Sequence, residues 1–420
     1  MTHNPPTRIQ DDFISSYMRL CDLDNSEAPA IYHRWVCLSI LGAYMGRKIW
    51  IDFGIGPIYP NQYIMLMGSP GTRKGAAMAV GRKLLKATGF NRFSADKTSK
   101  ERFLMDMKQF DLPTNAALED VEDLAFGDPS ESYIMSGEFT DFIGQGNMDF
   151  ITLLTNLWDN LEEYKHPKIQ GKSVVVHKPT VNMIGANTPD GFALAFPPEA
   201  LGNGFLSRVI LLHADPTATK IAWPSAADPL QLATLAGRMA EVKDSISGEI
   251  VVTSEAKALG KEIYDKEIPV DDPRFIHYQQ RRFIHMLKVA MLLAVFDMSD
   301  KIMPVHIRRA NTLLVRAERV MPRALGEFGA SKYSSVAGKL LSHLAGCHKP
   351  QTPSELFRVI SRDIGKMSEL VDILQNLKHS EKIQAVSVGG KSGYLPMHKV
   401  KKEWPEHLLD NSWLTEQELI

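Results

Sequence analysis

The sequence predicts an α/β fold built on a largely parallel sheet. Between residues 60 and 215, short apolar runs alternate with longer segments in which apolar residues have helical spacing. Runs of this length are typical of buried strands, and their alternation with helices is typical of a parallel sheet. Glycine or polar residues follow the runs, which places turns and polar side chains at one edge of that sheet. The predicted strands are Tyr63–Met67, Tyr133–Ser136, Val181–Ala186 and a fourth that begins at Val209.

The composition indicates a soluble chain in a reducing compartment. With 420 residues the chain can bury more than one core, and its length suggests two or three domains. Its net charge is −1, so any binding to nucleic acid must be confined to one face or domain. Cys21, Cys37 and Cys347 lack metal-type spacing and argue against a disulfide framework or a zinc site. Without an apolar stretch of roughly 18 residues or a signal-peptide pattern, we expect a cytoplasmic protein with no membrane partner.

The first 55 residues predict a helical segment that packs on the domain behind it. Apolar residues have helical spacing over 11–23 and 28–45, and residues 47–53 alternate like a strand. In the second helix, Tyr32 and Trp35 are large enough either to stack on a base or to fill the core. Core packing is the simpler interpretation.

The most informative stretch is P-N-Q-Y-I-M-L-M-G-S-P-G-T-R-K-G, residues 60–75. It predicts a strand, a glycine-rich turn and a helix, the order in which backbone N–H groups and a helix N-terminus form an anion site. The spacing from Gly68 to Lys74 matches a P-loop, whose lysine reaches the β- and γ-phosphates of a nucleotide. Arg73 replaces the usual small residue, and Gly75 replaces the Ser or Thr whose hydroxyl meets Mg²⁺. A turn with a lone lysine is the alternative. The nucleotide-binding candidates are Gly68, Ser69, Pro70, Gly71, Thr72, Arg73, Lys74 and Gly75.

A carboxylate, Glu138, follows the second predicted strand. A helix capped by Thr98 or Ser99 is expected before that strand, and the acidic stretch 119–131 is expected to be a surface connection. An open α/β sheet places its chemistry beyond the carboxyl ends of its strands. The position of Glu138 therefore favours catalysis, with an ordinary surface carboxylate as the alternative.

A hairpin is predicted between the second and third strands of the sheet. Residues 165–178 read K-H-P-K-I-Q-G-K-S-V-V-V-H-K, with the Gln-Gly pair near the tip and Lys168 and Lys172 beside it. The third strand then ends at Asn187, and Arg208 stands directly before the fourth. These four polar residues therefore flank predicted strands or a turn.

A separate small unit is predicted near the C-terminus. Residues 226–330 are mainly helical, and the apolar side of the helix over 281–296 should be buried. Three further helices are expected over 333–344, from Thr352 and over 366–378, before a hairpin around the Gly389-Gly390 pair. Three helices followed by a two-stranded wing is the order of a winged helix.

This small unit carries a local excess of positive charge. Residues 332–402 contain twelve Lys and Arg against five Asp and Glu, a difference of seven positive charges. The excess favours a partner with a phosphate backbone, and Arg358, Lys366 and Lys391 are candidate contacts. A winged helix used for protein contacts is the alternative. The acidic tail over 399–420 is either frayed or a docking peptide for a replication partner.

Taken together, these features resemble a ring-forming AAA+ ATPase. The closest likeness is to the replication ATPases of phages and mobile elements, which are related to superfamily III viral helicases and minichromosome maintenance helicases. It runs from about Ala28 to Pro396 and rests on the P-loop stretch, S-G-E-F, K-P-T-V-N-M-I-G-A-N-T-P, G-F-L-S-R and the terminal winged helix. The resemblance implies a AAA+ P-loop sheet with a helical N-terminal leader, a helical lid and a C-terminal winged-helix domain. The implied boundaries are 1–55 for the leader, 56–225 for the ATPase core, 226–330 for the lid, 331–398 for the winged helix and 399–420 for the tail.

The resemblance also implies roles for individual residues. Lys74 would bind the phosphates of ATP, and Glu138 would correspond to the Walker B glutamate that polarises the attacking water. Asn187 would be sensor 1, although an asparagine there can also simply cap a turn. Arg208 would be the arginine finger that acts on a neighbouring subunit, with an ordinary ion-pair residue as the alternative. Phosphoryl transfer depends on positioning and charge neutralisation, so a lysine, a carboxylate, a polar sensor and an arginine are the expected parts.

Two departures from the family pattern weaken the case for fast hydrolysis. Gly75 lacks the P-loop hydroxyl, and Gly137 stands where the Walker B aspartate is expected, so both usual protein contacts to Mg²⁺ are missing. Ser136, Thr72 or water would have to complete the coordination of Mg²⁺, an ion that tolerates many waters. ATP binding is therefore better supported than fast hydrolysis.

The leading hypothesis is a hexameric, ATP-dependent DNA helicase or translocase of phage-type replication, working in the bacterial host cytoplasm if a phage encodes it. Lys168 and Lys172 would then belong to a pre-sensor-1 hairpin that grips single-stranded DNA in the pore, while the winged helix contacts duplex. The alternative is an ATP-binding, weakly hydrolysing DNA-binding scaffold or helicase loader at a replication origin. A metabolic P-loop kinase is disfavoured by the basic winged helix.

Overall fold

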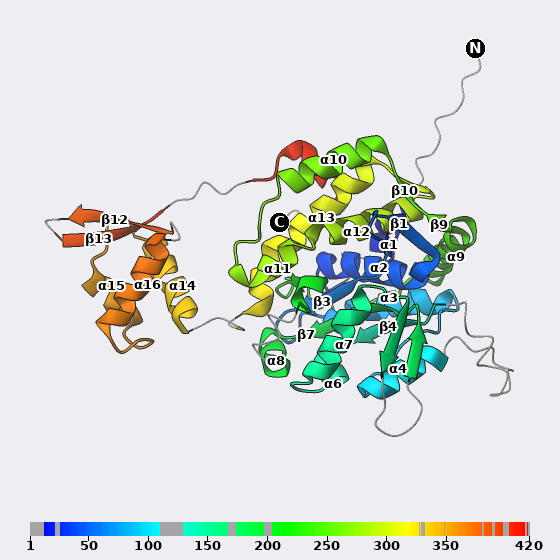
Figure 1. Cartoon of the computed structure of the whole chain (residues 1–420), viewed down its shortest axis with the longest axis horizontal. Coiled ribbons are helices and arrows are strands. Elements are labelled where there is room, and N and C mark those ends of the chain that lie inside the picture. The colour runs from blue at the N-terminus through cyan, green and yellow to red at the C-terminus, as the bar shows by residue number, and fades with distance from the viewer. Residues whose placement is uncertain are drawn as a thin grey trace, which may run out of the picture. The chain divides into compact units, whose positions relative to one another are not determined.

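The computed structural model of the chain divides into two compact units (Figure 1). The larger unit contains residues 1–326 and 404–420, and the smaller unit contains residues 327–403. The residues that the structure describes are 12–21, 26–109, 129–166, 174–196, 204–326, 328, 332–347, 349–379, 382–388, 391–397, 403–415 and 418.

The larger unit is built on a parallel sheet of four strands in the order β4-β7-β3-β8 (Figure 1). This confirms the mixed α/β class and the parallel sheet predicted from the apolar runs. Every residue of β3 and β7 is buried, as expected for strands covered on both faces. An isolated parallel bridge between Phe93 and Tyr133 extends the pairing beyond β4. The strands are β3 (Tyr63–Met67), β4 (Glu131–Ser136), β7 (Thr180–Asn187) and β8 (Val209–His213).

Helices cover both faces of this sheet and so make three layers (Figure 1). Tyr133 pairs with Asn182 and Tyr63 pairs with the next residue, Met183, so the two tyrosines point to opposite faces. The hydroxyl of Tyr133 lies 2.9 Å from that of Ser39 in α2, and α3 packs on α2. The hydroxyl of Tyr63 donates to a carbonyl of α7 at 2.8 Å, and α6 and α8 lie on the same face as α7. The helices are α2 (Ala30–Met45), α3 (Lys74–Ala87), α6 (Phe139–Ile143), α7 (Met148–Trp158) and α8 (Pro189–Ala195).

The aromatic side chains of α2 belong to the core. Tyr32 and Trp35 are buried, which confirms core packing over base stacking. The hydroxyl of Tyr32 donates to the carbonyl of Met67 at 2.6 Å and so ties α2 to the end of β3. Gly42 lets α2 approach the sheet closely, because a Cβ there would lie 2.8 Å from the carbonyl oxygen of Pro60.

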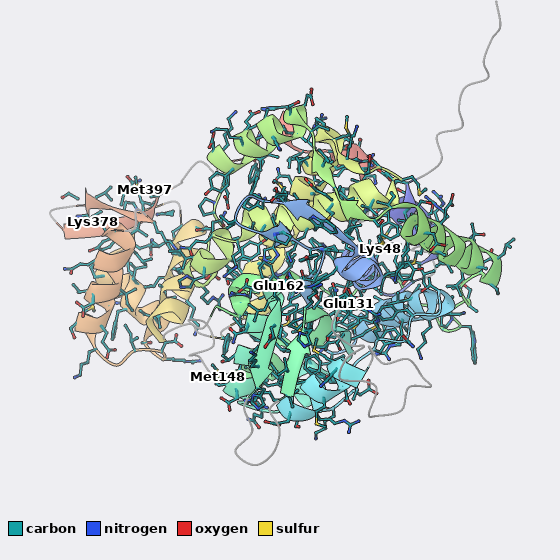
Figure 2. The ribbon with its side chains drawn as sticks, turned by 45° about the vertical axis from the view of Figure 1, so that its right-hand side comes forward. Lys48, Glu131, Met148, Glu162, Lys378 and Met397 are labelled. Atoms are coloured by element: carbon teal, nitrogen blue, oxygen red, sulfur yellow. The ribbon has the colours of Figure 1, made fainter. Side chains whose placement is uncertain are left out.

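Arg47 and Glu131 form hydrogen bonds that connect the strands at the amino edge of the sheet. Glu131 and Glu162 are labelled in Figure 2. One oxygen of Glu131 accepts from the backbone N–H of Arg47 at 2.7 Å, and the other accepts from Arg92 at 2.6 Å. The buried guanidinium of Arg47 donates to Thr180 at 2.7 Å and to Glu162 at 3.2 Å. These charged hydrogen bonds satisfy the buried arginine and hold the first residues of β4 and β7 together.

The remaining helices of the larger unit lie before β4 and after β8. Ser99 caps α4, because its Oγ accepts from the backbone N–H of Arg102 at 3.2 Å. The mainly helical character predicted for 226–330 is confirmed over its described residues. In the described part of the chain, no helix is long and apolar enough to cross a bilayer. The helices are α1 (Phe13–Leu20), α4 (Lys100–Gln109), α9 (Pro229–Ser245), α10 (Ser254–Asp265), α11 (Ile276–Gln279), α12 (Arg282–Phe296) and α13 (Pro304–Leu325), with short turns η2 (Gly46–Lys48), η4 (Leu206–Arg208) and η5 (Pro273–Phe275).

Several short strands of the larger unit lie outside the main sheet, and of those given below the sequence predicted β1 alone, within the strand expected over 47–53. β1 pairs with β2 and with β9, so the strand predicted over 47–53 lies outside the main sheet. β10 and β11 form a second small pair. A strand of two residues gives no alternation that a sequence pattern can reveal. These strands are β1 (Ile49–Asp52), β2 (Pro57–Ile58), β9 (Gly248–Glu249), β10 (Val251–Val252) and β11 (Lys301–Ile302).

The smaller unit contains three helices followed by an antiparallel hairpin. Thr352 and Glu355 form the predicted capping box with Pro353 in the first turn. The unit has its own core, to which Leu340, Leu356 and other buried residues contribute. The Gly389-Gly390 tip lies outside the described residues. The elements are α14 (Lys332–Ala345), α15 (Pro353–Ile360), α16 (Met367–His379), β12 (Ile383–Val388) and β13 (Lys391–Pro396).

The segment after the smaller unit returns to the larger one. Glu418 forms an ion pair with Arg34 in which both side chains are buried. The indole N–H of Trp413 donates to Asp12 at 2.9 Å, and the carbonyl of Leu408 accepts from Asn311 at 3.0 Å. The tail, with its short turns η6 (Glu406–Leu408) and η7 (Asn411–Trp413), thus docks on its own chain.

Candidate functional site at the carboxyl edge of the sheet

The chain leaves β3 and β7 in opposite directions. From β3 it runs past β7 to β4, whereas from β7 it crosses to β8 on the other side of β3. Because crossovers between parallel strands are right-handed, opposite directions place the following helices on opposite faces. α3, which follows β3, and α8, which follows β7, lie on opposite faces of the sheet. The crevice beyond the carboxyl ends of β3 and β7 is therefore the topological switch point, where open α/β sheets bind ligands.

The loop from Gly68 to Arg73 fills this crevice and leads into α3. The backbone N–H of Gly68 donates to the carbonyl of Asn187 at 3.4 Å. Gly68 has no room for a side chain, because a Cβ would lie 2.8 Å from the hydroxyl of Tyr32 and 2.9 Å from that of Thr72. The loop is therefore held tightly between β7 and α2, and it presents the N-terminus of a 14-residue helix to the crevice. Such a terminus attracts anions.

Lys74, the first residue of α3, folds back over this loop. Its ammonium donates to the carbonyls of Gly68 at 2.7 Å and Ser69 at 3.1 Å, and to the hydroxyl of Thr72 at 3.1 Å. Burial lowers the pKa of Lys74, and the nearby carboxylate of Glu138 opposes that shift. The structure thus brings the predicted lysine and the predicted carboxylate into one electrostatic environment.

Glu138 and Asn187 stand on the same edge of the sheet as Lys74. Glu138 lies two residues beyond β4 and occupies the N-cap position of α6. The buried amide of Asn187 donates to the hydroxyl of Thr140 at 2.8 Å and accepts from the backbone N–H of Thr188 at 3.0 Å. These two bonds fix the orientation of the amide. Asn187 therefore joins the end of β7 to α6, the helix that Glu138 begins.

Sequence reasoning missed two side chains of this edge, His213 and Arg323. His213 ends β8 in register with Met67, and burial lowers the pKa of His213, with the charges of Arg323 and Lys74 acting in the same direction. Arg323 reaches this edge from α13, where it donates to Asp215 at 2.6 Å. The end of an apolar run was a usable signal for His213. Nothing in the sequence pattern connects Arg323 with a strand a hundred residues earlier.

Few side chains at this edge suit a Mg²⁺ ion. Gly75 and Gly137 offer no side-chain oxygen, and the buried hydroxyl of Thr72 donates to the carbonyl of Ser69 at 2.9 Å. Ser136 is buried at the end of β4. No group of three His, Cys, Asp or Glu side chains suited to a metal occurs among the described residues. The described residues at this edge therefore offer a Mg²⁺ ion few protein ligands, so that an ion bound there would be held mainly by water and by oxygens of a ligand.

A pocket of about 480 Å³ adjoins the loop from Gly68 to Arg73. Its volume is in the range of small-molecule sites, and Gly71 and Arg73 of the loop form part of its wall. The segment after β8 supplies most of the rest. The lining residues are Glu27, Gly71, Arg73, Pro216, Thr217, Thr219, Lys220, Ile221 and Ala222.

The structure does not bring Arg208 to this site. Arg208 immediately precedes β8 and so lies at the opposite, amino edge of the sheet; the five residues of β8 span about 16 Å. Its guanidinium donates to Asp159 at 2.5 Å and to the carbonyl of Gly204 at 3.0 Å, and only 9% of the side chain is exposed. Arg281, which sequence reasoning missed, contacts the same Asp159 at 3.4 Å and is 33% exposed.

The candidate nucleic-acid residues lie elsewhere. β5 (Glu163–His166) and β6 (Val174–His177) pair antiparallel before β7, whereas Lys168 and Lys172 between them lie outside the described residues. In the smaller unit, Arg358 on α15 and Lys366 before α16 are exposed. Lys391 begins β13.

A comparison of the chain with models of known protein families, and another with curated proteins, finds no match. The functional interpretation therefore depends on the geometry and chemistry of the residues themselves.

Proposed function

We propose that this chain is an ATPase that acts on DNA, an ATP-dependent helicase or translocase that works as a ring of six copies in phage-type replication. One observation carries the proposal: a helix N-terminus, Lys74, Glu138 and Asn187 meet at the topological switch point of a parallel sheet. That combination supplies an anion site, a cation, a carboxylate and a polar side chain within one crevice.

Each residue has a chemical task in the proposed reaction. The N–H groups of the loop and the ammonium of Lys74 bind the phosphates, exchanging the loop carbonyls that Lys74 now contacts for phosphate oxygens. Glu138 orients and polarises the water that attacks the terminal phosphorus. Asn187, whose amide is fixed by Thr140 and Thr188, contacts the transferred group. Little covalent chemistry by the protein is required, because phosphoryl transfer depends on position and charge.

The place of Arg208 supports action between copies. An arginine at the amino edge of the sheet cannot reach the P-loop of its own chain at the carboxyl edge. In a ring of identical copies, one edge of a subunit can face the other edge of its neighbour. Arg208 would then neutralise charge on the neighbour's nucleotide, as an arginine finger does.

The smaller unit supports a DNA partner. Its helix-helix-helix-hairpin order is that of a winged helix, and residues 332–402 carry twelve Lys and Arg against five Asp and Glu. Arg358 and Lys366 are exposed and so are available to phosphates. In the proposal, this unit contacts duplex while Lys168 and Lys172 hold a single strand in the pore.

A second candidate is an ATP-binding scaffold or helicase loader with weak turnover. The glycines at 75 and 137 favour it, because they leave the metal with few protein ligands. DNA-stimulated ATP turnover of the wild-type chain and of Glu138→Gln separates the two. The helicase proposal expects turnover that DNA stimulates and that Glu138→Gln loses while ATP still binds. Tight ATP binding without DNA-stimulated turnover in the wild-type chain would favour the scaffold instead.

A further inference from the structure

We infer that Glu27 holds Arg73 as a counter-ion, and that a bound nucleoside triphosphate takes Arg73 over as a second phosphate-binding cation beside Lys74. This inference rests on the proposed binding of ATP at the P-loop. It assigns a task to the arginine that stands where this kind of loop usually has a small residue.

The backbone of Arg73 is the first observation. Arg73 has φ +57° and ψ +28°, and it is one of four described non-glycine residues with positive φ. Residues other than glycine rarely adopt this backbone conformation, and those that do so cluster at ligand sites. A glycine at position 73 would adopt this backbone conformation without strain. The presence of arginine there is therefore not explained by the backbone conformation.

The contacts of Glu27 are the second observation. One carboxylate oxygen accepts from Nε of Arg73, and the other accepts from the backbone N–H of Ile221 at 2.8 Å. The carbonyl of Glu27 accepts from the hydroxyl of Thr217 at 2.9 Å. The Ile221 N–H bond is the main cause, and Arg73 a further one, of the lowered pKa of Glu27. Glu27 is therefore a charged group held from several sides, whereas the Arg73 side chain is held, among the described residues, by its ion pair with Glu27.

The pocket joins these two observations. Glu27 and Arg73 both line it, together with Gly71 of the P-loop, so a ligand that enters the pocket from the loop meets the ion pair. The Arg73 side chain is 54% exposed, and pairs this exposed bind weakly. A triphosphate carries several negative charges and is favoured by the helix N-terminus, and a guanidinium can hold two of its oxygens at once. Exchange of the Glu27 carboxylate for a phosphate as the partner of Arg73 is therefore favourable.

Calorimetric titration of the full chain with ATP, ADP and AMP tests the inference. We expect Arg73→Gln to weaken ATP binding about tenfold, ADP binding less and AMP binding hardly at all, because the lost contact is to the outer phosphates. Glu27→Gln should tighten ATP binding about threefold, since it removes a weak competitor for Arg73. In the Arg73→Gln background the Glu27 change should have no effect. Glu249→Gln, which removes an exposed charge on β9, is the matched control.

Two further variants separate failure of this inference from failure of the proposed function. If Lys74→Ala loses ATP affinity while Arg73→Gln and Arg73→Gly keep it, the P-loop site stands and the inference is wrong. If the wild-type chain binds no ATP, or Lys74→Ala binds it unchanged, both fail. Weaker ATP binding by Glu27→Gln would also overturn the inference, because Glu27 would then support the pocket. Thermal unfolding of each variant establishes that the fold is intact.

Discussion

The carboxylate of Asp159 binds the guanidinium of Arg208 within one chain, with 2.5 Å between Oδ2 and the terminal nitrogen. The same carboxylate contacts Arg281, and the guanidinium groups of both arginines lie over the ring of Trp158, at 5.6 Å for Arg208 and 5.3 Å for Arg281. One carboxylate thus serves two arginines, and the cluster retains positive charge. It lies at the sheet edge opposite Lys74, so in the proposed ring it would serve the nucleotide of a neighbouring copy.

Action between copies can be tested by mixing inactive subunits. Arg208→Ala and Glu138→Gln chains should each lose ATP turnover, because each lacks a group that the reaction needs. A mixture should recover part of the activity, since some of its interfaces join an intact Glu138 to an intact Arg208. Turnover of the mixture is the measurement, and light scattering is the control for assembly. A fully assembled mixture with no recovered turnover would contradict the account.

The two glycines near the expected metal position predict a gain of function. A Cβ at Gly75 would meet no atom within 4 Å, so Gly75→Ser can add a hydroxyl without displacing a neighbour. We expect the Mg²⁺ concentration for half-maximal ATP turnover to fall by about tenfold or less, the effect of one added ligand worth about 1 kcal/mol. Gly237→Ser, at an equally open position in α9, should leave it unchanged. An unchanged Mg²⁺ requirement in Gly75→Ser would place the metal away from α3.

Two buried histidines predict a loss of stability in mild acid. Burial lowers the pKa of His285 to about 3, and burial lowers the pKa of His33 to about 4. The unfolded chain binds protons on these residues near pH 6.5, whereas the folded chain does not. The contribution of these neutral histidines to the free energy of unfolding is therefore complete above pH 6.5. It is lost as the pH falls toward the folded pKa values, and at pH 5 the loss is about 2 kcal/mol for each residue.

Urea unfolding at pH 7 and pH 5 measures this effect. His285→Gln keeps a donor for the carbonyl of Ser207, which lies 3.1 Å from Nε2 of His285, and removes the titration. Its unfolding free energy should change less between the two pH values than that of the wild-type chain. The same pH dependence in both proteins would show that His285 does not titrate as described.

The smaller unit should contribute phosphate contacts that salt weakens. If Arg358 and Lys366 each contact one phosphate of duplex DNA, neutralising both should reduce the slope of log K against log salt by about 1.8. Binding of labelled duplex to the Arg358→Gln, Lys366→Gln double variant measures this slope. Lys257→Gln, at an exposed position of α10, controls for net charge. A double variant with the slope of the wild-type chain would remove these residues from the DNA interface.

The residues whose positions could be predicted from the sequence are those whose signal is local. The loop before Lys74, the carboxylate after β4 and the asparagine that ends β7 follow apolar runs, so strand and turn patterns were enough to place them at one edge. Asp159 carries no such signal, because its partners Arg208 and Arg281 meet it only through tertiary packing. The two-residue strands β9 and β10 were missed because so short a segment has no measurable periodicity.

The contact between Glu27 and Arg73 shows the same limit near the site itself. Arg73 was visible in the sequence as a departure from the loop pattern, but its left-handed backbone and its partner were not. Glu27 reaches it from the segment before α2, and Ile221 holds Glu27 from the segment after β8. Contacts between three distant segments depend on how α2 and β8 pack around β3, which no local pattern encodes.

The most direct test of the account is the equilibrium affinity of Lys74→Ala for ATP. Lys83→Ala, which removes an exposed lysine from the same helix, is the matched control. We expect Lys74→Ala to bind ATP at least tenfold more weakly than the wild-type chain, because a charged contact to phosphate is lost, and Lys83→Ala to bind it normally, with both variants unfolding at the wild-type temperature. Wild-type ATP affinity in a folded Lys74→Ala chain would contradict the assignment of the nucleotide site and the proposed function that depends on it.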